Sequence, residues 1–141
     1  MKIVVGAVTV IFSLLYVGQL ISVVNLGIAQ KWGLQEDPAG VDSLTTYLEV
    51  WTARWDLAWL WTLPGAGVLI LISHPWWPFL ALIGGGAYVD AGGREAAKLR
   101  GLAEQGIRTG TPGERRAQTI AYVTFIAVGC LAIALALSEL S

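Results

Sequence analysis

Apolar residues along this chain fall into two long runs with two shorter ones between them. The run 3–29 contains no charged residue, and neither does the run 117–138. At a helical rise of about 1.5 Å per residue, each is long enough to cross a hydrocarbon layer of about 30 Å. The pattern between them predicts two further helices, over 43–73 and 76–105, whose uncharged parts are shorter. We therefore expect four helices.

The first run has a competing interpretation as a secretory signal peptide. Lys2 precedes it, and residues 27–29 (Gly-Ile-Ala) resemble a small-x-small cleavage site. However, the uncharged run is much longer than the core of about 7–15 residues that signal peptides have. We expect a retained helix over 3–29.

Three polar residues interrupt this first helix at intervals of three: Gln19, Ser22 and Asn25. This spacing places them close together on one helix face. They are expected either to hydrogen-bond between helices or to line a polar cavity. Gly18 and Ser22 also form a small-xxx-small pair, which permits close approach of another helix.

The two middle helices are predicted to form a hairpin. Asp42 or Ser43 can cap the helix over 43–73, and Pro64 should bend it because proline removes a backbone donor and clashes with the preceding turn. The stretch 73–75 (Ser-His-Pro) is expected to turn the chain, with His74 solvated or capping. A re-entrant hairpin is the alternative to two complete crossings.

The last helix is predicted over 112–138. Thr111 can cap it, Pro112 suits its first position, and Glu114 can reach back to the capping N–H group. Ala132 and Ala136 offer another small-xxx-small contact.

These elements predict one domain over 1–141, an all-α integral membrane four-helix bundle in up-down order. Both long connections then lie on one side and both termini on the other. Every Lys and Arg except Lys2 lies in or beside the connections, so the positive-inside rule predicts cytoplasmic connections and outside termini in a cell membrane. A Met-Lys start before a long apolar run favours the opposite orientation.

Composition supports a membrane protein. Hydrophobic residues make up 55% of the chain and charged residues 13%, whereas soluble domains have about 25% charged residues. The net charge of −1 gives no field that would favour nucleic acid. With one His and one Cys, a His/Cys metal site is not expected. Phosphate-loop, dinucleotide-binding and serine-hydrolase motifs are absent, and we expect no cofactor.

Tryptophans mark the start of the second helix. Trp51, Trp55 and Trp59 recur every four residues and so form a stripe along one face, with Trp61 nearby. Such a stripe is typical of an interfacial belt, where the indole ring is buried and its N–H stays wet. The alternative is an aromatic wall of a pocket for a lipophilic or cationic ligand.

Charged residues lie among these tryptophans. Glu49 and Asp56 are seven apart and share a face, and an unpaired Asp56 at the edge of the apolar run would be costly. One interpretation is an ion-pair network that holds the helix. The other is that Asp56 and Glu49 are catalytic, proton-handling carboxylates. Arg54 is expected to pair with a carboxylate or to stack on an indole (Glu49, Asp90, Trp51 or Trp61).

Three functional hypotheses follow. The first is an accessory or structural bundle, or one that binds a lipophilic ligand, without cofactor chemistry. The second is a membrane enzyme that acts on an isoprenoid or lipid-like substrate by acid/base chemistry. The third is a small proton-coupled transporter with a polar path from Asn25 and Gln19 towards a carboxylate. The candidate ligand-binding residues are Trp51, Arg54, Trp55, Trp59, Asn25 and Gln19. Expected partners are membrane lipid, copies of the same chain or a larger membrane complex, and a hydrophobic small molecule.

Overall fold

The computed structural model describes residues 2–11, 13–32, 35 and 39–141, and their regular structure is helical apart from one isolated β-bridge. The helices are α1 (Lys2–Ile11), α2 (Ser13–Val24), α3 (Leu26–Lys31), α4 (Ser43–Leu57), α5 (Thr62–Leu71), α6 (Trp77–Glu104) and α7 (Pro112–Leu140). The predicted all-α class is confirmed.

The last two predicted helices are each one continuous helix, as expected. At the start of α7, the Glu114 N–H donates to the Thr111 hydroxyl at 3.3 Å, and the Thr111 N–H donates to the Glu114 carboxylate at 2.6 Å. This is the predicted capping box. In the turn before α6, the exposed His74 accepts a hydrogen bond on Nδ1 from the Trp76 N–H at 3.3 Å, which agrees with a capping role.

The helix predicted over 43–73 is two helices instead. The chain leaves regular α-helix after Leu57 and resumes it at Thr62. Pro64 lies in the first turn of α5, where a missing N–H costs little, whereas in mid-helix its ring would clash with the carbonyl four residues earlier. The predicted bend is thus a full interruption just before Pro64.

The helix predicted over 3–29 is also interrupted, and residue 12 lies outside the described residues. Asn25 has an extended backbone (φ −148°, ψ 90°), and its side-chain oxygen accepts a hydrogen bond from the Ile28 N–H at 3.1 Å. Asparagine competes for backbone hydrogen bonds and so favours a cap over a helix interior. A continuous helix through Asn25 was therefore wrong.

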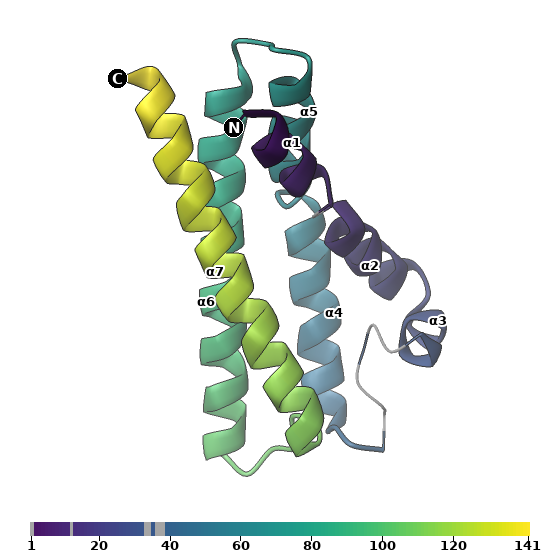
Figure 1. Cartoon of the computed structure of the whole chain (residues 1–141). Helices are drawn as coiled ribbons and strands as arrows, with labels where there is room; N and C mark the ends of the chain where they lie inside the picture. Colours follow the sequence, from purple (N-terminus) through teal and green to yellow (C-terminus); the bar gives the residue numbers. More distant parts are fainter. Residues whose placement is uncertain (1, 12, 33–34, 36–38) are drawn as a thin grey trace.

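The chain runs up and down along the long axis of the molecule (Figure 1). Helix α1 packs on α5, α2 packs on α4, and α6 packs on both α5 and α7. The start of α1 and the end of α7 lie towards one end of the molecule, and the starts of α4 and α7 lie at the other (Figure 1). The connections are joined by a bridge between Val41 and Thr109, and by the Arg108 N–H donating to the Asp42 carboxylate at 2.7 Å. Asp42 makes this contact instead of the predicted side-chain cap of α4.

Adjacent glycines of α6 make close contacts with two different helices. A Cβ atom on Gly84 would lie 2.5 Å from the Leu63 nitrogen in α5, and one on Gly85 would lie 2.7 Å from the Gly129 carbonyl oxygen in α7. Ala132 and Ala136 of α7 are buried as well. Small residues therefore mediate the helix contacts of α6 and α7, as predicted.

Two helical stretches of the described chain are long and apolar enough to cross a membrane: Val4–Val24 and Pro112–Leu140. In the most apolar part of each, only 13% and 17% of the residues are buried. The helices of 43–73 and 76–105 do not meet this criterion, because the first is interrupted and the second half of α6 is highly charged.

Candidate functional site

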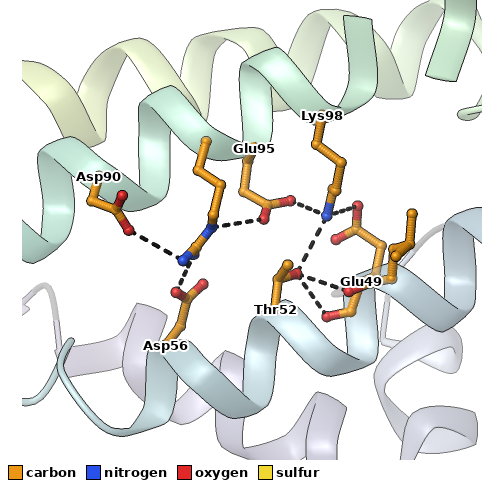
Figure 2. A network of polar contacts seen from close by, with 8 residues as sticks. Glu49, Thr52, Asp56, Asp90, Glu95 and Lys98 are labelled. Carbon is orange, nitrogen blue, oxygen red and sulfur yellow. Dashed lines mark hydrogen bonds and ion pairs between the residues drawn. The ribbon is translucent and has the colours of Figure 1, made fainter. Parts of the chain in front are cut away.

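A row of charged side chains joins α4 to α6, and we call it the charge ladder. It consists of Glu49 and Asp56 on α4 and of Asp90, Arg94, Glu95 and Lys98 on α6. Figure 2 shows these side chains in the space between the two helices, with Thr52 of α4 among them. On α6, Asp90, Arg94 and Lys98 recur every four residues and Glu95 precedes Lys98 by three, while the two α4 carboxylates are seven apart, so each set lies along one side of its helix.

Arg94 is the centre of one half of the ladder. Its guanidinium is hydrogen-bonded to the Asp56 carboxylate and donates to the Asp90 carboxylate at 3.1 Å. Its Nε lies 3.6 Å from a Glu95 carboxylate oxygen. The Asp56 side chain is only 7% exposed, whereas that of Asp90 is 62% exposed. Asp56 is therefore a buried carboxylate held by one arginine.

Lys98 is the centre of the other half. Its ammonium group lies 3.0 Å from a Glu49 carboxylate oxygen and is paired with Glu95. It also lies 3.3 Å from the hydroxyl of Thr52. The side chains of Glu49, Glu95 and Lys98 are all at most 13% exposed. Glu95 links the halves because it contacts both Arg94 and Lys98 (Figure 2).

The ladder has four carboxylates and two cations, so its formal charge is negative when all six groups are ionised.

A contact between α2 and the end of α4 shows where the ladder lies along the molecule. The Tyr16 hydroxyl donates to the Leu57 carbonyl at 3.4 Å, and Tyr16 is two residues from residue 14, the centre of Val4–Val24. Asp56, beside Leu57, thus lies near the level of the middle of that apolar stretch. Glu49 is seven residues away, or about 10 Å towards the connections.

The tryptophan stripe lies on the outside of the molecule. Trp51, Trp55, Trp59 and Trp61 are all at least 44% exposed, and the rings of Trp55 and Trp59 lie 6.0 Å apart. The Arg54 guanidinium lies 4.8 Å from the centre of the Trp51 ring. This is one of the predicted arrangements of Arg54, and the carboxylates considered for it pair with Arg94 and Lys98 instead.

A shallow groove connects the stripe to the ladder. It has a volume of about 390 Å³, and its lining includes Trp55, Asp56, Trp59 and Asp90. Only these two tryptophans of the stripe line it. The groove is partly open to the outside, whereas the enzyme hypothesis calls for an enclosed pocket. A catalytic role of Asp56 or Glu49 stays a prediction.

The polar residues of the first helix serve separate local contacts. The Ser22 hydroxyl donates to the Gly18 carbonyl at 2.9 Å and accepts from the Gln35 amide at 3.3 Å. Asn25 caps α3. The Gln19 side-chain oxygen is buried without a hydrogen-bond partner among the described residues. A ligand-binding role of Gln19 and Asn25 also stays a prediction.

The sequence indicated only part of the ladder. The Asp90–Arg94 pair can be predicted because the two residues are four apart on one helix. The pairing of Arg94 with Asp56 and of Lys98 with Glu49 joins residues far apart in the chain. The sequence does contain one signal for these pairs. The α6 segment carries two cations and two carboxylates at helical spacing, and the α4 segment carries two carboxylates seven residues apart.

Among the described residues, no group of three or more His, Cys, Asp and Glu side chains could hold a metal ion. Comparison of the chain with protein-family models, with curated proteins and with solved structures finds no match.

Proposed function

We propose that this chain is a multi-pass membrane protein that acts as an accessory or structural bundle. In this proposal the charge ladder fastens α4 to α6 inside the protein, and the tryptophan stripe contacts lipid or a partner protein. The observation that carries the proposal is the distribution of side chains. Large apolar residues lie outside on the two apolar stretches, while buried charges are paired between helices.

The exposed apolar residues argue for a lipid environment. On the first stretch they include Val4, Ile11 and Leu14, each at least 61% exposed, and on α7 they include Ile120 and Val123, each at least 60% exposed. The core helix of a soluble protein is mostly buried, so this low buried share argues against that alternative. Contiguous exposed apolar surface is typical of contact with a membrane or a protein.

The ladder is consistent with burial in a bilayer. Ionisable side chains inside a membrane are costly and face the interior of a bundle, where they pair with one another. Asp56 satisfies this condition through Arg94, as do Glu49 and Glu95 through Lys98. In this arrangement α4–α5 and α6 complete the four crossings, and the connections, in or beside which every Lys and Arg except Lys2 lies, are in the cytoplasm.

The pairing of every ladder carboxylate favours a structural over a catalytic role. An acid or base catalyst needs a proton-transfer path to a substrate atom within hydrogen-bond distance, whereas Asp56 is bound to Arg94. One observation favours a second candidate, the small proton-coupled transporter. The groove places Asp56 and Asp90 beside two indole rings, a combination that suits a lipophilic cation.

Membrane insertion and orientation are tested together by cysteine labelling. In a Cys130→Ser background, Gln105→Cys probes a connection and Ser141→Cys probes the C-terminal end. We expect the protein to stay in the membrane fraction at alkaline pH. A membrane-impermeant maleimide should label Ser141→Cys in intact cells, and Gln105→Cys only after permeabilisation. Release without detergent would contradict the proposal, and the inverse labelling would contradict the orientation alone.

The accessory role is tested by purification in mild detergent, with Asp56→Asn as the variant. The accessory role predicts a stoichiometric protein partner or a homo-oligomer, and a structural ladder predicts that the variant loses thermal stability. A transporter predicts instead a variant that stays stable but no longer releases a lipophilic cation from cells. The second result would replace the accessory role with the transporter.

A further inference from the structure

A second groove runs between α6 and α7 near the connections. It has a volume of about 270 Å³. Its apolar wall includes Ala96 and Leu99 of α6 and Val123 and Ile126 of α7, and its polar residues include Arg100 and Arg115. This groove is separate from the charge ladder, which lies between α4 and α6.

The groove changes in polarity along its length. Arg115 lies in the first turn of α7, close to the connections, and Ile126 lies eleven residues further along the same helix. At about 1.5 Å per residue, this separation is about 16 Å. One leaflet contributes about half of the 30 Å hydrocarbon layer. The groove is therefore about as long as the hydrocarbon region of one leaflet, and its two arginines lie at the end where the head groups would be.

Positive charge is available at that end. Arg115 makes no ion pair with any described residue, and Arg100 pairs only with Glu104, where both side chains are at least 64% exposed. Glu114, the neighbouring carboxylate, accepts the Thr111 N–H of its own capping box. The groove can thus offer two guanidinium groups to an anion.

We propose that this groove binds one anionic phospholipid. The phosphate lies between Arg100 and Arg115, and an acyl chain lies along Val123 and Ile126. The inference rests on the proposed membrane location. It commits to a lipid because a free phosphate would leave the apolar wall unused, and to an anionic lipid because basic pockets between helices on the cytoplasmic side attract acidic head groups. The groove beside Asp56 and Asp90 is acidic and does not suit such a ligand.

The test is native mass spectrometry of the whole detergent-purified protein with phosphatidylglycerol or phosphatidylcholine of identical acyl chains. We expect selective retention of phosphatidylglycerol. One basic residue near a membrane surface contributes about 1 kcal/mol, so Arg115→Gln should weaken retention about fivefold. Ala96→Phe, which fills the apolar wall at unchanged charge, should weaken retention of the lipid as well.

The matched control is Arg116→Gln, which removes the neighbouring exposed arginine of α7 that does not line the groove and should leave retention unchanged. Equal retention of both lipids, or equal losses in Arg116→Gln and Arg115→Gln, would overturn the proposal. Displacement of the lipid by millimolar glycerol phosphate would show a site for a free anion and would also overturn it. If Arg115→Gln does not fold, Arg100→Gln replaces it. These failures would leave the membrane location standing, because alkaline extraction tests that location separately.

Discussion

Helix α6 contacts α7 and α4 in two opposite ways. Against α7 it presents Gly85 and Gly92, at which an added Cβ would lie 2.7 Å from backbone carbonyl oxygens of Gly129 and Tyr122. Against α4 it presents Arg94 and Lys98, whose long side chains reach across to carboxylates (Figure 2). One contact is made by backbones and the other by the ends of side chains.

In the proposed membrane environment lipid supplies no hydrophobic drive between helices, and the two contacts are two other ways of holding helices together. The α6–α7 contact relies on close packing, so it depends on shape and tolerates no added volume. The α4–α6 contact relies on charge pairing, so it depends on each partner being present. We therefore expect volume changes to break the first contact and charge changes to break the second.

The largest effect is expected for Gly85→Val. The added side chain meets the Gly129 backbone, which cannot move aside without separating the helices. Overpacking typically costs about 1–3 kcal/mol, and a backbone obstacle should place this variant near 3 kcal/mol. Thermal unfolding in detergent measures the loss. Gly86→Val is the matched control, because a Cβ there meets nothing within 4 Å. Equal losses in both variants would mean that helix propensity, not packing, is responsible.

A smaller loss of about 2 kcal/mol is expected for Asp56→Ala. Removing one partner of a fully buried pair costs about 3–5 kcal/mol, but Arg94 is 27% exposed and keeps Asp90. The same unfolding assay applies. Asp90→Ala, at a carboxylate that is 62% exposed, should cost less than 0.5 kcal/mol, as exposed ion pairs do. A loss for Asp90→Ala as large as that for Asp56→Ala would show that burial does not set the strength of this contact.

The smallest of the three effects, about 1 kcal/mol, is expected for Lys98→Gln. The glutamine removes the cation shared by two buried carboxylates, but its amide can still donate a hydrogen bond to one of them, and the other can take up a proton instead of staying an unpaired charge. Arg100→Gln changes the same charge two residues away, where the side chain is 83% exposed, and should cost less than 0.5 kcal/mol. If the two variants unfold alike in lipid-free detergent, Lys98 does not hold α4 to α6.

Local signals predicted α6 and α7 well, and long-range contacts were harder to predict. The capping box of Thr111 and Glu114 lies within four residues, so the sequence alone locates the start of α7. The helix is interrupted at Asn25 because the Asn25 side chain caps α3. The pattern of apolar residues does not predict this, because it continues unchanged through Asn25. The pairing of Asp56 with Arg94 spans 38 residues, so only the packing of α4 on α6 reveals it.

The contact between the two connections has a consequence for how the chain assembles. The Arg108 N–H and the Asp42 carboxylate are 66 residues apart, so this contact can close only after the ribosome has made nearly everything up to α7. It ties the first half of the molecule to the second at the end opposite the turn at 72–76 (Figure 1). If the chain is divided at that turn and the two fragments are expressed together, they should therefore still associate and reconstitute the bundle.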